Sequence, residues 1–567
     1  MPYRAPLNDI RFLLDHVSGY GAIAATDRFA EASRDTADAI LGEAARLCQD
    51  VLTPLQRVGD TDPARLDNGI VRTPKGFAEG YRAIAEGGWI GMSADPEHGG
   101  MGLPVTLAMI VNEMMSSACL AIQLGPLMSQ GQIEALENHA SDEIRSLYLP
   151  RLVSGEWAGT MNLTEPQAGS DVGALTTRAE PNGDGTYAIT GQKIYISWAD
   201  NDFTENVCHL VLARLPDGVP GTKGISLFLV PKRIPDAEGN PGDRNALRVV
   251  SLEHKMGLHG SPTAVMSYEG ATGWLVGPEH DGMAAMFTMM NNARLGVATQ
   301  GIGVAEAALQ HAVAHAMERR QGRASGSGAI IEHADVRRML AEMKAQVFAA
   351  RAIALLCAGA IDMATATGSA EWDARAALLT PIAKAFGTDT GIEVASKGIQ
   401  VHGGMGFIEE TGAAQYLRDV RVTAIYEGTN GIQAMDLVGR KLRDGGEAAH
   451  ALIDEICARA EAARGHEPDL ANAVWNAAES LRETTEWLVG RTDPEDRNAG
   501  AVPYLRAFAL VLGGWAHLAA AMSGSPAQAK LARFYILRML PEHAGLLAHA
   551  REGAADLMAL GPDEIAA

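Results

Sequence analysis

The spacing of apolar residues changes twice along this chain of 567 residues, near Gly155 and again near Met283. Before the first change, apolar residues recur every three or four positions, for example over residues 27–52 and 74–90, which predicts amphipathic helices. Between the changes, short β-branched and aromatic runs predict strands, and after the second change the helical spacing returns. This order of helices, strands and helices predicts a multidomain α+β fold.

Turn residues separate the predicted strands of the middle block. Asn182-Gly183-Asp184-Gly185 tolerates positive φ angles and precedes a strand candidate at 186–190, which indicates a hairpin. Further strand candidates are 207–213, 225–230 and 264–268. The block therefore predicts an antiparallel β-barrel or sandwich, and no strand is expected before it.

The predicted elements divide the chain into four domains. They are an N-terminal helical domain (1–157), a middle β domain (158–282), a helical bundle (283–445) and an additional C-terminal helical block (446–567). Helices are expected at 104–115, 293–320, 334–366, 370–400 and 431–442.

Residues 507–529 carry no charged side chain and are long enough to span a membrane. The stretch also contains Gly513, Gly514, His517 and Pro526, and only its first part is strongly apolar. We therefore expect a buried helix of the core here, and no membrane association.

Acidic residues outnumber basic ones, with 69 Asp and Glu against 47 Lys and Arg and a net charge of −22. This charge repels nucleic acid phosphates, and because no long Lys/Arg run offsets it, no nucleic acid partner is expected. Five widely spaced cysteines fit a reducing compartment, and residues 1–6 lack the apolar stretch of a signal peptide. We expect a cytoplasmic protein without a metal site, since the histidines show no metal-ligand spacing.

Several familiar catalytic and nucleotide-binding motifs are missing from the sequence. Gly301-Ile302-Gly303 resembles the start of a dinucleotide fingerprint, but position 306 is Glu and the segment is helical in pattern. There is no Walker A loop, no Gly-x-Ser-x-Gly elbow and no His-Glu-x-x-His zinc motif. The chemistry must therefore come from other residues.

Two glycine-containing stretches are candidates for ligand binding. In residues 161–171, Gly169 and Ser170 allow the backbone to approach an anion closely, or they form an ordinary polar turn. In residues 398–406, four glycines permit close packing against a phosphate or a ring, or they make a tight turn between helices. The residues alone leave both alternatives open.

A third stretch, residues 425–433, contains a candidate base. Thr429 or Asn430 can cap the following helix, whose free N–H groups favour an anionic ligand. Glu427 precedes the cap between apolar residues, where partial desolvation would raise its pKa and make it a better base. The alternative is a solvated loop glutamate without a role.

Together these three stretches resemble, in order and approximate spacing, the signatures of the acyl-CoA dehydrogenase family. Thr-Glu-Pro-Gln-Ala-Gly-Ser-Asp at 164–171 and Ile-Tyr-Glu-Gly-Thr at 425–429 are specific, and the resemblance covers about residues 40–445. The order of helices, strands and helices also matches the family's architecture. The resemblance implies an FAD-dependent enzyme that desaturates an acyl-CoA thioester.

The resemblance assigns the cofactor contacts residue by residue. They are Met161, Leu163, Thr164, Gly169, Ser170, Tyr195, Ser197, Arg319, Gln400, Gly403, Gly404 and Thr429. Tyr195 and Ser197 depart from the family's usual Trp and Thr. Arg319 is assigned to the FAD pyrophosphate of a neighbouring subunit, and Arg320 competes for this role because the usual Phe-Gly after it is reduced to Gly322.

The same resemblance implies that Glu427 removes the proton α to the thioester carbonyl while the β-hydrogen leaves as hydride to the flavin. Ser170, Arg294 and Gly428 are the implied substrate contacts. The acidic residue that the family usually places at Asn291 is missing, which puts the role of Arg294 in question.

The implied partners are an acyl-CoA, an electron-transfer flavoprotein and a second copy of the chain. Long-form members of the family carry an added helical block like 446–567, so a homodimer is favoured over a tetramer. The closest alternative is an acyl-CoA oxidase that passes electrons to oxygen. A flavin-containing DNA-binding relative is disfavoured because the added block has 10 basic against 17 acidic residues.

Overall fold

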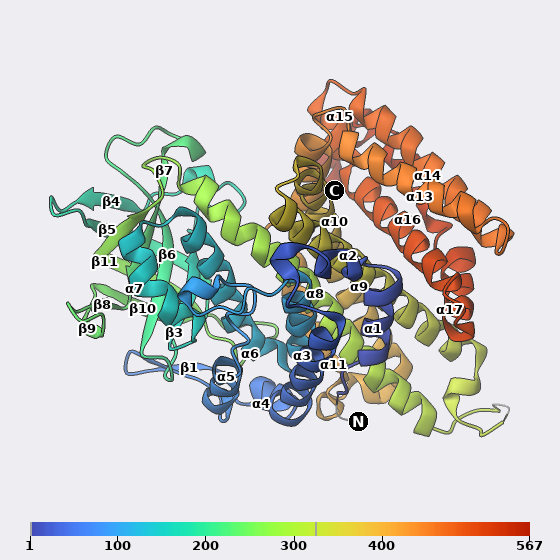
Figure 1. The fold of residues 1–567 in the computed structure, drawn as a ribbon, viewed down its shortest axis with the longest axis horizontal. Helices are drawn as coiled ribbons and strands as arrows, with labels where there is room; N and C mark the ends of the chain where they lie inside the picture. The colour runs from blue at the N-terminus through green and yellow to red at the C-terminus, as the bar shows by residue number, and fades with distance from the viewer. Residues whose placement is uncertain (1–2, 324–325) are drawn as a thin grey trace. The chain divides into compact units, whose positions relative to one another are not determined.

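Strands occupy one part of the chain, with helices before and after them (Figure 1). The computed structural model of the protein describes residues 3–323 and 326–567, and within these residues every strand falls between Arg65 and Val276. The predicted order and the multidomain α+β class are therefore confirmed. The chain forms two units, Glu43–Gly296 and Met1–Gly42 with Val297–Ala567. The divisions at residues 157, 282 and 445 stay predictions.

The unit Glu43–Gly296 contains the strands and four complete helices. Its helices are α4 (Leu55–Thr61), α5 (Phe77–Glu86), α6 (Val105–His139) and α7 (Asp142–Val153). The sequence predicted α6 only to about residue 115, but its apolar run continues, interrupted by a non-helical Cys119. The Gly159 N–H donates to the hydroxyl of Ser129 (2.9 Å), which fixes α6 against the first strand of the main sheet.

The main sheet contains a closed ring of strands. Its strands are β3 (Trp157–Asn162), β4 (Arg178–Pro181), β5 (Tyr187–Ser197), β6 (Asn206–Arg214), β7 (Ile225–Pro231), β10 (Leu247–Leu252) and β11 (Thr263–Val276). Pairing runs from β11 to β5, β4, β6, β7 and back to β11, so the predicted barrel is confirmed. Val211, Phe228 and Tyr268 belong to the buried core cluster of these strands. β3 and β4 each pair with β6 in parallel, unlike the antiparallel arrangement expected.

Two short hairpins accompany the barrel. β8 (Arg233–Pro235) pairs with β9 (Pro241–Arg244), and β1 (Arg65–Asp67) pairs with β2 (Ile70–Arg72). The expectation of no strand before residue 158 was therefore wrong. Asn68 and Gly69 form the β1–β2 turn with φ angles of 50° and 78°, the conformation that Asn-Gly hairpins require.

Long helices form the framework of the other unit. α9 (Ala334–Thr367) and α10 (Ala370–His402) agree with their predicted ranges, and α8 (Gly282–Glu318) enters this unit at Val297. Arg351 of α9 and Glu306 of α8 form a buried ion pair, with Nη2 2.8 Å from Oε2. The remaining helices before the added block are α1 (Leu7–His16), α2 (Tyr20–Ala24), α3 (Arg34–Arg46), α11 (Ala413–Val420) and α12 (Asn430–Asp436).

The added block is helical, as predicted. It comprises α13 (Glu447–Ala463), α14 (Pro468–Val489), α15 (Pro494–Ala499), α16 (Ala501–Ala521), α17 (Pro526–Arg538), α18 (Glu542–Ala550), α19 (Ala555–Ala559) and α20 (Pro562–Ala566). His517 of α16 contacts the Ala345 carbonyl oxygen of α9 (3.1 Å), and Arg506 pairs with Glu393 of α10 (2.6 Å) and Glu542 of α18 (2.9 Å). Buried and charged contacts thus join the block to α9 and α10.

The uncharged stretch 507–529 contains parts of two helices. α16 ends at Ala521, and α17 begins after Ser525, whose hydroxyl caps it. Among the residues that the structure describes, three helices, α6, α9 and α16, are long and apolar enough to cross a membrane by composition, but 94%, 83% and 94% of their most apolar windows lie buried in protein. α16 is accordingly a core helix.

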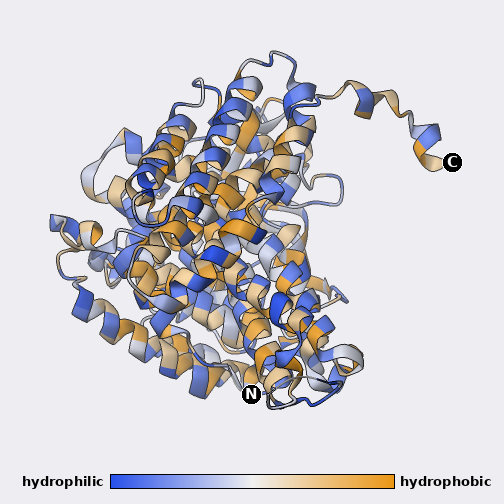
Figure 2. Cartoon of the chain, turned by 90° about the vertical axis from the view of Figure 1, so that its right-hand side faces the viewer, coloured by the Kyte–Doolittle hydropathy of each residue, from blue (hydrophilic) through white to orange (hydrophobic). Residues whose placement is uncertain are grey.

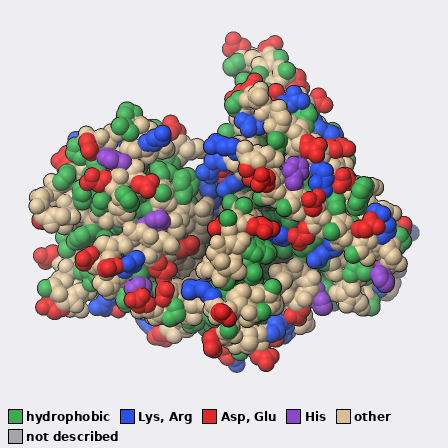
Figure 3. Space-filling model, turned by 45° about the horizontal axis from the view of Figure 1, so that its top comes forward, with side chains coloured by type: hydrophobic (Ala, Val, Ile, Leu, Met, Phe, Trp, Pro, Cys, Tyr) green, Lys and Arg blue, Asp and Glu red, His purple; other side chains and the backbone are tan. Residues whose placement is uncertain are grey.

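Charged side chains are interspersed over the face of the molecule drawn in Figure 3, without one large patch of a single sign. The five cysteines carry free thiols, and four of them are buried. Over residues 3–323 and 326–567, no group of three or more His, Cys, Asp or Glu side chains is placed to hold a metal ion.

Candidate functional site

Met161 lies on β3, opposite a buried polar network. The Asn162 side-chain amide donates to the Thr160 hydroxyl, and the Tyr268 hydroxyl donates to the Asn162 side-chain oxygen, both at 2.9 Å. The Thr160 hydroxyl also lies 2.7 Å from Nδ1 of His209, whose pKa is lowered to about 3, chiefly by burial. Because alternate residues of a strand face opposite sides, this network leaves Met161 on the other face, half-buried.

A buried ion pair fastens the loop that follows β3. Lys193 Nζ lies 2.9 Å from Glu165 Oε1 and donates to the Leu163 carbonyl oxygen at the same distance, and both charged side chains are buried. Thr176 and Thr177 add backbone and hydroxyl hydrogen bonds to Glu165. Burial by itself raises the pKa of Glu165, but Lys193 and these hydrogen bonds outweigh it and lower the pKa to about 2. The pair therefore fixes the main chain at Leu163.

Tyr195 lies on a β-bulge of β5. Lys193 pairs with Met266 and Ile196 pairs with Ala264, so β5 carries one more residue than β11 between these pairs. Tyr195 has a φ of 60° and a side chain that is 61% exposed, whereas the adjacent Ile196 is buried. Bulges re-aim side chains beside functional sites, and a left-handed conformation in a non-glycine residue is costly. Tyr195 therefore combines a strained backbone with an exposed ring, and its contact with a cofactor stays a prediction.

Other predicted cofactor residues lie next to this bulge along the chain or are hydrogen-bonded to it. The Ile194 N–H donates to the Thr164 carbonyl oxygen (2.9 Å), which joins the loop after β3 to the bulge. Thr164 and Ser197 are half-buried, and Gly169 and Ser170 are exposed. A Cβ atom at Gly169 would meet nothing within 4 Å, so packing inside the chain does not require glycine there.

Arg294 is buried in α8, only 5% exposed. Its Nη1 donates to the Asn291 side-chain oxygen (3.2 Å), and the guanidinium lies 5.9 Å from the centre of the Phe287 ring. An uncharged amide therefore occupies the position of the family's acidic partner. A contact between Arg294 and acyl-CoA stays a prediction.

Glu427 lies in the other unit, on a loop whose carbonyl groups are held by two side chains. It is half-buried and has a left-handed φ of 57°, followed by Gly428 with a φ of 84°. Lys384 of α10 donates to the Gly428 carbonyl oxygen (2.9 Å). Gln433 of α12 donates to the carbonyl oxygens of Glu427 (3.2 Å) and Gly428 (3.3 Å). These bonds maintain a strained backbone at the predicted base.

Thr429 caps α12, and Asn430, the other candidate cap in the sequence, does not. Its hydroxyl accepts a hydrogen bond from the Ile432 N–H (3.2 Å). Asn430 instead accepts from Lys384 (2.9 Å) and donates to Asp389 (2.7 Å). Burial, opposed by the Asn430 hydrogen bond, raises the pKa of Asp389. Asn430 thus joins the loop to α10, and Thr429 caps the start of α12.

Arg319 and Arg320 differ in how their guanidinium groups are used. Arg320 donates to the Ser327 carbonyl oxygen, within the loop that follows α8. Arg319 is exposed, and its guanidinium makes a weak contact of 3.5 Å with Gln321. Arg319 is therefore the better placed of the two for an external anion.

The predicted residues at the end of α10 lie close to those at the end of α8. The rings of His402 and His315 stack with centroids 4.4 Å apart, and His402 immediately precedes Gly403 while His315 lies one turn before Arg319. Gln400, Gly403 and Gly404 are exposed, and a Cβ atom at either glycine would meet nothing within 4 Å.

Gly406 behaves differently from Gly403 and Gly404. A Cβ atom there would lie 2.3 Å from the Ile399 carbonyl oxygen, so this glycine serves the turn after α10. The turn alternative therefore holds for Gly406, and ligand contact at Gly403 and Gly404 stays a prediction.

Most of the predicted residues lie in three groups: beside the β5 bulge, on the loop before α12, and at the adjoining ends of α8 and α10. Lys193, Glu165, Lys384 and Gln433 support these groups but were not among the residues predicted from sequence. A polar side chain flanked by apolar residues, as in Ala383-Lys384-Ala385-Phe386, is the sequence feature that could have indicated one of them, Lys384.

The residues fit a large anionic, aromatic cofactor such as FAD. Tyr195 presents an exposed aromatic ring on a bulge, which suits stacking against or beside a ring system. Arg319 provides a guanidinium for a pyrophosphate, and the exposed Gly403 and Gly404 leave room for close backbone approach.

Four family models match the chain in succession. They are the acyl-CoA dehydrogenase N-terminal domain (34–156), middle domain (160–271) and C-terminal domain (280–442), and an acetyl-CoA dehydrogenase C-terminal-like domain (450–561). The last model covers most of the added helical block.

Similar proteins agree with these matches. The 3-methylmercaptopropionyl-CoA dehydrogenase of Ruegeria pomeroyi is 43% identical over 547 residues, which cover 94% of this chain and 92% of that protein. The structure of Caenorhabditis elegans ACDH-11 in complex with C11-CoA shares the fold with a TM-score of 0.81 at 20% identity, covering 95% of this chain and 92% of that one. A Bacillus anthracis acyl-CoA dehydrogenase complexed with FAD has a TM-score of 0.76 at 21% identity, covering 94% and 90%. This chain therefore belongs to the acyl-CoA dehydrogenase family, a family of FAD-dependent oxidoreductases that act on acyl-CoA thioesters.

Proposed function

We propose that this enzyme oxidises 3-methylmercaptopropionyl-CoA to its trans-2-enoyl thioester, a reaction of dimethylsulfoniopropionate breakdown. The observation that carries the proposal is the 43% identity to the Ruegeria pomeroyi enzyme of that name over nearly the whole of both chains. The N-terminal segment 3–12 and the total length resemble the same bacterial subgroup.

Glu427 is the proposed base. The hydrogen bonds from Lys384 and Gln433 hold its backbone in the left-handed region, so the carboxylate direction is set before substrate binds. The carboxylate takes the proton α to the thioester carbonyl, and the Glu427 N–H stabilises charge on the carbonyl oxygen. FAD, when bound, accepts the β-hydrogen together with its electron pair, so one proton and one hydride leave the substrate.

The remaining predicted residues would hold the cofactor and substrate. Met161, Leu163, Thr164, Tyr195 and Ser197 would meet the flavin ring, and Gly169 and Ser170 the region between flavin and CoA. Arg319, Gln400, Gly403 and Gly404 would meet the FAD of a neighbouring subunit, with Thr429 at the cofactor and Arg294 and Gly428 at the thioester.

An anaerobic titration of the flavin absorbance tests this function. The panel contains 3-methylmercaptopropionyl-CoA with short straight-chain, branched and long-chain acyl-CoA thioesters. We expect the sulfur-containing thioester to bleach the flavin at the lowest concentration. Preferred bleaching by another thioester would reassign the substrate, and no bleaching by any of them would contradict the dehydrogenase reaction.

Glu427→Gln is the matched control for the titration. The amide has the size of the carboxylate but cannot take a proton, so we expect a folded, yellow protein without bleaching. Retention of most of the bleaching rate would remove Glu427 from the role of base.

An electron-transfer flavoprotein is the proposed electron acceptor. Turnover should require that protein and consume little oxygen. Rapid oxygen uptake in its absence would identify an acyl-CoA oxidase instead.

The proposal includes a homodimer in the cytoplasm. The added block covers α9 and α10, for instance where Gly513 of α16 approaches Ala349 of α9 so closely that a Cβ atom would lie 3.0 Å away. Because this face is already covered, a further pair of subunits is not needed there, which supports a dimer over a tetramer.

A further inference from the structure

Residues 555–567, here called the C-terminal arm, leave the helical block that precedes them. The Ala554 N–H donates to Asp496 of α15 (3.0 Å), and Ala554 is buried, so the root of the arm is fixed. From Ala555 onward the residues are exposed apart from a half-buried Gly561. Figure 2 shows this segment running away from the preceding helices to its end.

The composition of the arm is unsuited to solvent. Leu557, Met558, Leu560 and Ile565 are between 56% and 73% exposed. The arm also carries three acidic residues, Asp556, Asp563 and Glu564, and no Lys or Arg. Contiguous exposed apolar side chains beside polar ones mark an interaction segment.

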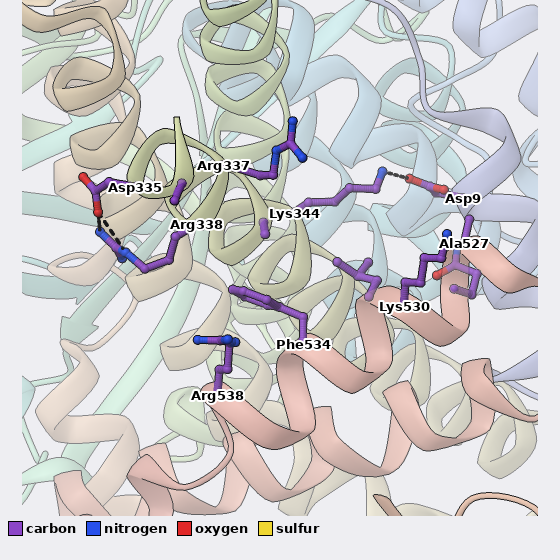
Figure 4. Close-up of a pocket in the computed structure, with 13 residues that line it drawn as sticks. Asp9, Asp335, Arg337, Arg338, Lys344, Ala527, Lys530, Phe534 and Arg538 are labelled. Atoms are coloured by element: carbon purple, nitrogen blue, oxygen red, sulfur yellow. Dashed lines mark hydrogen bonds and ion pairs between the residues drawn. The ribbon is translucent and has the colours of Figure 1, made fainter. Parts of the chain in front are cut away.

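A cavity of about 930 Å³ lies between the start of α9 and α17 in the same unit. Its apolar lining includes Ala341, Leu531 and Phe534. Figure 4 shows the Phe534 ring with basic side chains around it. The basic residues at the cavity are Arg337, Arg338, Lys344, Lys530 and Arg538, against the acidic Asp9 and Asp335.

Two of these basic side chains differ from the others in having no carboxylate partner among the described residues, although the Arg538 guanidinium lies 5.9 Å from the centre of the Phe534 ring. Arg338 pairs with Asp335 (2.7 Å) and Lys344 pairs with Asp9 (3.0 Å). No ion pair of Lys530 or Arg538 occurs among residues 3–323 and 326–567, and both side chains are exposed. This cavity, here called the α9–α17 groove, therefore combines an apolar lining with two cations in a protein of net charge −22.

The arm and the groove are complementary in charge and in apolar content. A short helical segment with apolar anchors and acidic side chains is the kind of ligand that an apolar groove with basic edges binds. The arm starts beside α15, whereas the groove is lined by α17, and Figure 1 places these helices at opposite ends of the C-terminal block. The arm also points away from its own block, so a groove on another molecule is the better match.

We propose that the C-terminal arm of one copy docks in the α9–α17 groove of a second copy of this chain, with Lys530 and Arg538 facing Asp563 and Glu564. In a two-fold dimer each chain gives one arm and accepts one. This exchange adds to the dimer interface and does not depend on the identity of the thioester substrate.

Truncation after Ala554 is the first test, because it removes the arm and leaves its root. Sedimentation velocity over a range of protein concentrations should show that the dissociation constant of the dimer rises at least tenfold, with flavin content and substrate bleaching of the remaining dimer unchanged. An unchanged dissociation constant overturns the proposal.

Charge reversal distinguishes docking between copies from docking within one copy. Asp563→Lys/Glu564→Lys and Lys530→Glu/Arg538→Glu should each raise the dissociation constant severalfold. A mixture of the two variants should restore the wild-type value, because each arm then meets a groove of opposite charge on its partner. If only a chain that carries all four substitutions recovers, the arm docks on its own molecule and the proposal fails.

Zero-length carbodiimide cross-linking provides a direct readout. An amide between Lys530 and Asp563 or Glu564, formed with loss of water, should appear in a band of twice the chain mass. Lys530→Arg is the matched control, since it keeps the charge and the dimer but cannot form this cross-link. The same peptide pair only in the single-chain band, or its absence in both bands, contradicts the proposal.

Discussion

The ammonium nitrogen of Lys384 lies 2.9 Å from the carbonyl oxygen of Gly428, the residue that follows Glu427. Lys384 is wholly buried in α10 and also donates a hydrogen bond to Asn430. A buried cation therefore holds the backbone on the C-terminal side of the base. The position of the Glu427 carboxylate depends on this contact as well as on the glutamate itself.

Replacing Lys384 by Met should lower kcat by about ten- to a hundredfold with a smaller effect on KM. The change removes the Lys384 hydrogen bonds to the half-buried Gly428 carbonyl oxygen and Asn430 side chain, which keep only those from Gln433 and Thr388. Losing these charge-assisted bonds costs about 1–3 kcal/mol and loosens the loop. Steady-state kinetics and the pH profile of kcat measure the effect, since a displaced Glu427 would shift the profile. Lys397→Met, on the same helix, is the control and should leave kcat unchanged. Equal losses in both variants would show that the effect of Lys384 is not specific to the loop.

Glu427→Asn should stabilise the protein while abolishing activity. The left-handed backbone of Glu427 costs about 1 kcal/mol, and Asn tolerates this region better than Glu. We expect the free energy of unfolding to rise by about 0.5–1 kcal/mol, measured by urea denaturation. Glu427→Gln keeps the strain and should show no gain. A lower stability of the Asn variant would contradict strain at this position.

Glu134→Gln should stabilise the protein above neutral pH but not at pH 5. Burial raises the pKa of Glu134 to about 7, opposed by the Asn292 hydrogen bond and assisted by Glu137. Because the folded state holds this proton more tightly, stability falls as pH rises from about 4.5 to about 7. Removing the charge should recover about 2 kcal/mol at pH 8, visible as a higher Tm.

Glu79→Gln, at an exposed position of α5, is the control for this pH comparison. It should show the wild-type pH dependence of Tm. If Glu134→Gln and wild type keep the same Tm difference at pH 5 and pH 8, Glu134 does not titrate as predicted.

Breaking the Lys193–Glu165 pair should destabilise the β domain and weaken FAD binding. Lys193→Met leaves a buried carboxylate, at a cost of about 3–5 kcal/mol, whereas Lys193→Met with Glu165→Leu should cost less because no charge remains. Thermal denaturation and flavin release on dilution measure the two effects. A double variant less stable than the single one would refute the account of the pair.

The Lys193–Glu165 pair should also make the stability of the protein depend on pH below 4.5. The folded-state pKa of Glu165, about 2, lies below its ordinary value of 4.5, so its stabilisation is present above pH 4.5 and is lost as pH falls toward 2. The Lys193→Met/Glu165→Leu variant should show a shallower loss of Tm over this range.

The sequence predicted the helices and the barrel because their spacing repeats over many residues. α9 and α10 end one and two residues beyond their predicted ranges, and the Asn182–Gly185 turn joins β4 and β5 as expected. The β1–β2 hairpin was missed because its strands are three residues long, too short to show alternation. The parallel pairing of β3 with β6 depends on contacts between segments far apart in sequence, which spacing does not record.

The sequence motifs indicated the candidate site residues but not the side chains that hold them in place. Glu427, Arg319 and Tyr195 lie in recognisable stretches, whereas Lys384 reaches the Glu427 loop from more than forty residues away. The left-handed backbone at Tyr195 follows from a bulge that only strand pairing reveals.

Closure of the barrel has a consequence for the order in which the chain folds. β11 is the last strand of the ring in sequence, and it pairs with both β5 and β7. While the chain is being synthesised, β5 and β7 have unpaired edges until residue 276 has left the ribosome. Exposed edges of this kind invite pairing with other chains, so partly made molecules are at greatest risk of aggregation during this interval.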